Sequence, residues 1–273
     1  TGQGDTDIPK AIPVSPNPTS STPALTPSGG PDSIPPIQLP PTPPPSTPSL
    51  PTASSPEDVQ FDLAEALSSQ KQWDAAVAEY LRFIEQFPNS KKVGTAFFRI
   101  GEAHFRQGNS NSARLYWTKQ LASTTAGPYA GIAAYRLGEM EFKENDYANA
   151  LIHYRKAAQL LDQPAVKQSA QYFSARCLQL LDKKIDAAQA FQPLADAAEA
   201  HPYRESSQFQ LALLREESGQ HTDALARFLK LSTKAEKPQI RAESLTRAAL
   251  LHLRLNEHQK ALQAIETALT TPG

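Results

Sequence analysis

Small and large apolar residues recur along residues 57–273 with a constant interval. The clearest column is an alanine: Ala76 and Ala113 are 37 residues apart, and the same interval then repeats to the end of the chain. The column consists of Ala76, Ala113, Ala150, Ala187, Ala224 and Ala261. A fixed interval of this length is typical of a tandem array of one supersecondary unit, in which each unit packs on its neighbours.

Further columns keep the same interval. Twelve residues before each alanine lies a small residue: Ala64, Gly101, Gly138, Ala175, Ala212 and Ala249. Four residues after each alanine lies a large apolar residue: Tyr80, Trp117, Tyr154, Phe191, Phe228 and Ile265. Within a unit these spacings fit the faces of helices rather than the alternation of strands. We expect the small residues to let two helices approach closely and the large ones to fill the gap between them.

Each unit is therefore predicted to be a pair of antiparallel helices. In the second unit the first helix is expected over Thr95–Arg106 and the second over Asn111–Ser123. Gly108 lies between them and can adopt the left-handed conformation that ends a helix. Asn109 and Ser110 follow and are suited to cap the next helix.

Prolines separate the predicted units, because proline cannot continue the interior of a helix. They are Pro88, Pro128, Pro164, Pro202 and Pro238. The predicted units are residues 57–93, 94–130, 131–167, 168–204, 205–241 and 242–273. Residues 1–56 differ in composition, with 17 of the 24 prolines and few large apolar residues. Such a segment cannot bury enough surface to offset its ordering entropy, and we expect a disordered tether with polyproline II character.

The repeated unit resembles the tetratricopeptide repeat. Ile100-Gly101-x-x-His104-Phe105, followed by Gly108, Ala113 and Trp117, is similar to that family's pattern. The family's usual unit has about 34 residues, so each unit here is longer by three, most simply through a longer turn between units or a longer second helix. The resemblance implies an all-α fold, a right-handed α-solenoid of about six helix-turn-helix units. The longer unit, together with the segments Phe83–Ser90 and Arg99–Ala103, resembles a bacterial cell-envelope subgroup. That subgroup includes an outer-membrane assembly lipoprotein and a Tol-Pal-associated periplasmic protein.

The resemblance also implies where a partner would bind. In this family the first helix of each unit lines the concave face of the solenoid. The aromatic residues that the family pattern places on this face are Phe61, Phe98, Tyr135, Tyr172 and Phe209, and the charged ones are Glu102, Glu139, Arg106 and Lys143. Aromatic and charged groups on one wall suit a peptide with apolar anchors and polar orientation. The alternative is that the aromatic residues pack against the neighbouring repeat as part of the core.

Charge and motifs narrow the function further. The net charge is −1, so nothing favours nucleic acid as a partner, and no apolar run approaches the roughly 20 residues of a membrane span. The single cysteine, Cys177, lies in an apolar column, which predicts a buried and inert thiol. The histidines lack the spacing of a zinc site, and no catalytic or phosphate-binding motif is present. We therefore expect a non-catalytic chain without a metal or other cofactor.

Three hypotheses of function remain: a scaffold that binds a protein or peptide, an accessory region of a larger cell-wall enzyme whose catalytic domain lies outside this chain, or a structural spacer. The chain opens at Thr1 without methionine, so it is either a fragment or a processed protein that had a signal peptide or a membrane tether upstream of residue 1. The envelope resemblance favours the periplasm or cell envelope of a bacterium, with the cytoplasm as the alternative. The last helix, Gln259–Thr270, is expected to leave part of its apolar stripe uncovered, which allows further repeats or self-association through that end.

Overall fold

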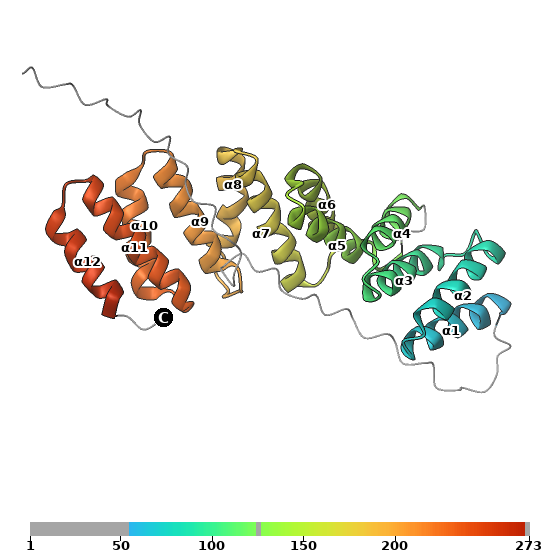
Figure 1. The fold of residues 1–273 in the computed structure, drawn as a ribbon. Helices are drawn as coiled ribbons and strands as arrows, with labels where there is room; N and C mark the ends of the chain where they lie inside the picture. Colours follow the sequence, from blue (N-terminus) through green and yellow to red (C-terminus); the bar gives the residue numbers. More distant parts are fainter. Residues whose placement is uncertain (1–54, 124–126, 271–273) are drawn as a thin grey trace, which may run out of the picture. The chain divides into compact units, whose positions relative to one another are not determined.

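The computed structural model describes residues 55–123 and 127–270, with side chains up to residue 267, and all regular structure in this part of the chain is helical. The helices are α1 (Pro56–Ser69), α2 (Trp73–Gln86), α3 (Val93–Arg106), α4 (Ser110–Ala122), α5 (Ala130–Lys143), α6 (Tyr147–Leu160), α7 (Pro164–Leu180), α8 (Lys184–Ala195), α9 (Arg204–Glu217), α10 (His221–Lys234), α11 (Pro238–Arg254) and α12 (His258–Thr270). Each helix packs on the next one along the chain, and successive helices run in opposite directions (Figure 1). The predicted all-α solenoid of helix pairs is confirmed. The predicted tether lies outside the described residues except for Ser55, which caps α1, and Pro56, which begins it.

The turn inside each helix pair has one conformation that recurs with the sequence interval. Its central residue has a positive φ in all six pairs: Lys71, Gly108, Asn145, Asp182, Gly219 and Asn256. The residue after it donates its amide to a carbonyl five residues earlier, as from Asn109 to His104 at 2.9 Å. This bond satisfies a carbonyl that the end of the first helix would otherwise leave free. The prediction for Gly108 is confirmed. Asn109 does occupy the N-cap of α4, but its side chain makes no capping hydrogen bond.

The pairing of small and large residues explains how the two helices of a unit fit together. A Cβ built on Gly101 would lie 2.4 Å from Nε1 of Trp117, and one on Gly138 would lie 3.0 Å from Cδ1 of Tyr154. The first distance is shorter than real contacts allow, so the Trp117 indole fits here only because residue 101 has no side chain. The two columns therefore form one contact between the helices of a unit, as the sequence predicts.

The residues that exceed the usual unit length are placed differently from unit to unit. The helices α7 and α11 have 17 residues each, and both begin at a proline, Pro164 and Pro238. Proline fits a first helical position because that position needs no amide donor. In these two units the extra residues lengthen the first helix, which the sequence did not predict, whereas residues 87–92 and 196–203 form longer turns between units, as it did predict. Another proline, Pro193, lies inside α8.

Candidate partner-binding surface

The five aromatic residues predicted to line the concave face are buried. Phe98, Tyr135 and Tyr172 are fully buried, and Phe61 and Phe209 nearly so. Four of them meet the large residue of the second helix in their own unit, as Tyr135 meets Tyr154 with ring centroids 5.4 Å apart. Phe98 instead stacks on Tyr129 at 4.7 Å. Their assignment as surface contacts for a partner is therefore wrong, and the alternative of core packing holds, because each ring fills the space between two helices.

Two tyrosine hydroxyl groups, one of them from this column, form hydrogen bonds inside the core. The Tyr135 hydroxyl lies 2.6 Å from the Ser169 hydroxyl, and the Tyr203 hydroxyl donates to the same Ser169 oxygen at 2.8 Å. Burial raises the pKa of both phenols, more than the Ser169 hydrogen bond lowers it. These tyrosines are therefore neutral groups that join α5, α7 and the segment before α9.

Charged side chains link the first helices of neighbouring units. Arg99 of α3 pairs with Glu65 of α1 at 2.8 Å, and Arg136 of α5 lies 3.6 Å from Glu102 of α3. Both pairs span 34 residues, so they are the same contact in successive units. Glu65 also accepts a hydrogen bond from the Tyr80 hydroxyl at 2.6 Å. The contact fixes one unit against the next with charged groups that have little access to solvent.

Glu102 and Glu139 flank Arg136 in this layer. Arg136 is 3.0 Å from Glu139, and all three side chains are close to nine-tenths buried. Burial raises the pKa of both carboxyl groups, although Arg136 acts against this shift in each case. Neither oxygen of Glu102 has a hydrogen-bond donor among the described residues. Buried polar groups normally have such partners, so Glu102 is under-satisfied. The predicted site residues Glu102 and Glu139 are thus brought together, but below the surface.

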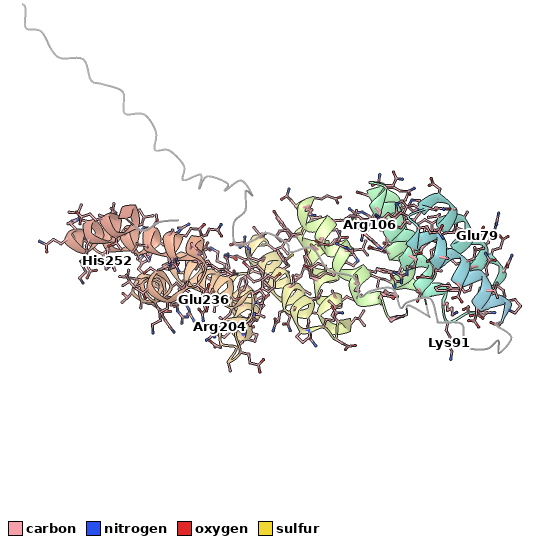
Figure 2. The ribbon with its side chains drawn as sticks, turned by 90° about the horizontal axis from the view of Figure 1, so that it is seen from below. Glu79, Lys91, Arg106, Arg204, Glu236 and His252 are labelled. Atoms are coloured by element: carbon pink, nitrogen blue, oxygen red, sulfur yellow. The ribbon has the colours of Figure 1, made fainter. Side chains whose placement is uncertain are left out.

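The predicted cations remain on the surface above this layer. Arg106, labelled in Figure 2, and Lys143 are exposed and lie 37 residues apart in equivalent positions. Among the described residues neither makes an ion pair or a hydrogen bond, although Arg106 acts electrostatically on Glu102 and Lys143 on Glu139. The residues before them, Phe105 and Phe142, are half-buried. We call Phe105, Arg106, Phe142 and Lys143 the α3–α5 surface.

The arginines of the charged layer were absent from the sequence prediction. Arg99 and Arg136 are 37 residues apart and each precedes a glutamate by three residues, so a search for charged columns would have found them. A helix places such a pair on one face, as the Arg136–Glu139 contact shows. What the sequence does not show is that each arginine also reaches back to the preceding unit.

Chemistry at other places is limited. Among the described residues, no group of three or more histidine, cysteine, aspartate or glutamate side chains could hold a metal ion. His153 lies 2.6 Å from Glu141 and His252 lies 2.6 Å from Glu257, so these imidazoles belong to local pairs. Burial raises the pKa of Cys177 to about 12, so its thiol stays protonated and unreactive at neutral pH. None of the helices in the described residues is both long and apolar enough to span a membrane.

Comparison with known proteins agrees with the helix pairs. Models of the tetratricopeptide repeat match residues 58–90 and residues 98–165. No curated protein matches the sequence.

Three solved structures are similar in fold. YrrB, described as a tetratricopeptide-repeat protein with an unusual peptide-binding site, has 17% identity and a TM-score of 0.53, over 70% of this chain and 90% of that one. A tetratricopeptide-repeat protein from Parabacteroides merdae has 15% identity and a TM-score of 0.52, over 80% of each chain. MamA has 18% identity and a TM-score of 0.51, over 63% of this chain and 94% of that one.

At these identities the likeness concerns the fold alone. Beyond residue 165 the same helix pair and the same turn continue through α12. Proteins built from this repeat generally act as non-catalytic scaffolds for protein–protein interaction. The two model matches identify tetratricopeptide repeats within residues 58–90 and 98–165, and the helix pair of these units recurs through the rest of the described residues.

Proposed function

We propose that the chain is a non-catalytic scaffold that binds a protein or peptide partner on the α3–α5 surface. The observation that carries the proposal is the repeated pair of an exposed cation and a half-buried aromatic ring, Arg106 beside Phe105 and Lys143 beside Phe142. Both cations lack an ion partner among the described residues. Most surface cations are merely solvated, but these two recur at equivalent positions in adjacent units.

The chemistry of this surface favours a partner segment with acidic and apolar side chains. Helix pairs stack about 10 Å apart, so carboxylates on an extended segment can reach Arg106 and Lys143 in turn. The half-buried rings of Phe105 and Phe142 add apolar surface beside these cations. Arg136 lies over the Phe105 ring, 5.2 Å from its centroid, and the ion pairs of Arg136 with Glu102 and Glu139 hold the base of the surface in place. Little side-chain entropy is then lost from this base on binding.

Fold likeness offers limited support for a peptide ligand. YrrB is described as having a peptide-binding site, and its fold is similar to the fold of this chain. The position of that site is not transferred here, because the identity is only 17%. The proposal therefore rests on the side chains of the α3–α5 surface.

The direct test is capture of a partner from a bacterial envelope extract by the purified chain. We compare the wild type with Arg106→Glu/Lys143→Glu, and identify captured proteins by mass spectrometry. The control is Arg155→Glu/Lys230→Glu, which makes the same change of charge at exposed positions on α6 and α10. We expect the affinity for the captured partner to fall at least about tenfold in the first variant only. Equal capture by all three proteins would show that the α3–α5 surface does not bind the partner.

We also propose that this scaffold acts in the bacterial cell envelope. The support is the resemblance of its long unit and of the segments Phe83–Ser90 and Arg99–Ala103 to envelope repeat proteins. Fractionation of the source cells, followed by immunoblotting of cytoplasmic, periplasmic and membrane fractions, tests this assignment. Recovery of the chain in the cytoplasmic fraction alone would contradict it.

A further inference from the structure

A groove of about 500 Å³ lies between α10, α11 and α12 (Figure 1). The residues that line it include Leu245 and the buried His252 of α11, Ala264 and Thr267 of α12, and Ser232 of α10. Sites for small molecules or for single large side chains have volumes of this order. The side chains around the groove show what kind of group fits it.

An aromatic ring fills the equivalent place in the second unit. Tyr116 of α4 is equivalent to Ala264, and its ring stacks on His104 with centroids 5.6 Å apart and an angle of 21° between the planes. His104 is in turn equivalent to His252. The last unit thus keeps the imidazole but has alanine where the second unit has the ring that stacks on it.

Smaller side chains also replace the neighbours of this ring. Phe97, whose ring centroid lies 6.4 Å from that of Tyr116, is equivalent to Leu245. Ile84 of α2 packs against the same cluster of buried residues as Tyr116, and it is equivalent to Ser232. The groove is therefore the space that Tyr116 and its neighbours fill in the second unit.

The groove does not result from where the sequence ends. Tyr116 packs on the cluster of buried residues from α1, α2 and α3, which is the side of the preceding unit. The groove accordingly lies on the α10 side of α12, and all three helices that form it are present. Inside the array each second helix packs mainly on the helices directly before and after it along the chain. By the same rule a further unit would pack on the opposite side of α12 and leave the groove open.

The groove has positive charge beside it. Arg241 and Lys260 line it, and no acidic residue is among its lining residues in the described part of the chain. Arg241 donates through Nη1 to the Ala235 carbonyl at 3.0 Å, and Lys260 pairs with Glu257 at 2.8 Å. Glu257 also lies 2.6 Å from the His252 imidazole and so holds it in place. A guanidinium has five N–H donors and an ammonium three, so both cations can bind a further carboxylate.

We propose that this groove binds an aromatic side chain of a partner protein that has an acidic residue next to it in its sequence. In the complex the ring stacks on His252 as Tyr116 stacks on His104, with Leu245 beside it. The neighbouring carboxylate pairs with Lys260 or Arg241 at the edge of the groove. A ring buried in this way combines a large apolar contact area with a defined stacking geometry.

The ring has to come from another protein. The residues outside the described part of the chain include no phenylalanine, tyrosine or tryptophan, so the proline-rich segment cannot supply it. Within the described part every such residue is buried or half-buried, so a second folded copy has no exposed ring to insert. The groove shares no residue with the α3–α5 surface and is therefore a second binding site.

The test titrates the full chain, isotope-labelled at its alanine and leucine methyl groups, with the end-blocked peptide Ser-Gly-Glu-Tyr-Glu-Gly-Ser. A stacked ring shifts nearby methyl signals in NMR spectra, so the signals of Ala264 and Leu245 should move and give the dissociation constant. A peptide with leucine in place of tyrosine should bind at least about tenfold more weakly. Unmoved signals at millimolar peptide overturn the proposal, and so does equal binding of the leucine peptide.

One variant fills the groove from inside the chain. Ala264→Tyr restores the ring of the second unit, so it should abolish peptide binding and raise the melting temperature. The control is Ala190→Tyr at the equivalent half-buried position on α8, which should bind the peptide as the wild type does. Peptide binding that survives in Ala264→Tyr overturns the proposal. A lower melting temperature in this variant would also contradict it, because the groove would then not accommodate a ring.

Charge variants test the carboxylate contact without altering the groove itself. Lys260→Gln should weaken binding of the glutamate peptide at least about threefold and leave a glutamine counterpart unaffected. Lys91→Gln, an exposed position before α3, is the matched control and should change neither. Arg106→Glu/Lys143→Glu should bind as the wild type does. Loss of binding in that double variant would place the peptide on the α3–α5 surface and overturn the proposal.

Discussion

The middle units and the last unit follow the same spacing but differ in what fills it. In the second to fourth units the columns place aromatic rings between the helices, and one large cluster of buried residues spans α3 to α9. In the last unit the residue equivalent to these first-helix aromatics is the exposed Thr246, and the large residue of the second helix is Ile265. The local cluster of buried residues consists of Leu245, Ala249 and Ala264. The comparison indicates that the interval determines the fold of a unit, whereas the volume of its buried side chains determines its stability.

This difference has a local consequence because repeat arrays are stabilised by each unit and its nearest neighbours. A unit with a small core should therefore open more readily than a unit with a large one. A groove of about 500 Å³ between α10, α11 and α12, lined in part by Leu229, Leu245 and Ala264, lies where the side chains of the last unit are small.

The largest effect is expected from truncating the large residue of the second helix in a middle unit, compared with its equivalent in the last unit. Trp117 is fully buried, so Trp117→Ala should lower the free energy of unfolding by about 3–5 kcal/mol. Ile265→Ala removes a half-exposed side chain and should cost less than about 1 kcal/mol. Urea unfolding, with hydrogen exchange to locate the effect, measures both. Similar losses in the two variants would show that the last unit is packed as well as the second.

A smaller effect is expected from the glycine that faces Trp117. Gly101→Ala places a Cβ against the indole and should cost about 1–3 kcal/mol, even though alanine favours a helix by about 0.5–1 kcal/mol. In the last unit the equivalent residue is Ala249, opposite the smaller Ile265, and Ala249→Gly should cost only the helix preference. Thermal and urea unfolding give the values. Recovery of stability in Gly101→Ala/Trp117→Leu would assign the loss to the contact, and no recovery would contradict that assignment.

The smallest effect concerns pH. Burial raises the pKa of Glu102 in the folded chain, so its contribution to stability is fully present below the ordinary pKa and is lost as pH rises through the folded value. In the last unit Lys260 and His252 lower the pKa of Glu257, whose contribution is present above the ordinary pKa and is lost as pH falls. Acidification should therefore stabilise the second unit through Glu102 and destabilise the last unit through Glu257.

Two variants separate these contributions. Relative to the wild type, Glu102→Gln should gain stability at pH 7 but not near pH 4, by roughly 1 kcal/mol for each unit by which the pKa is raised. Glu257→Gln should lose stability at pH 7 and match the wild type in acid. Thermal unfolding across this range measures both differences. The same pH dependence in the two variants would contradict the opposite directions of the two pKa shifts.

The sequence predicted the fold well because every feature that repeats is seen six times. The helix pairs, the turn at Gly108 and the contact of Gly101 with Trp117 follow from spacing and residue size alone. The turn column was harder to see, since its residues change from Lys71 to Gly108 to Asn145 and share only a backbone conformation.

The site was predicted less well for a physical reason. The interval shows which residues are equivalent, but it does not show which way a column faces. Tyr135 fits either an exposed wall or a packed core, and only its contacts with Tyr154 and Ser169 decide. Glu102 and Glu139 were located correctly as a pair of charged residues, but Glu102 meets Arg136 of the next unit, a contact that a pattern within one helix cannot reveal.

The recurring turn makes the units interchangeable at the level of the gene. Removal of residues 109–145 would connect Gly108 directly to Asp146, which is the kind of join that already exists at every turn. The shortened chain would pair α3 with α6 and set Gly101 against Tyr154, a contact that Gly138 makes in the intact chain. An array of this kind can therefore lose or gain a whole unit by one in-frame recombination. Its length can change in evolution without a new turn sequence between the helices.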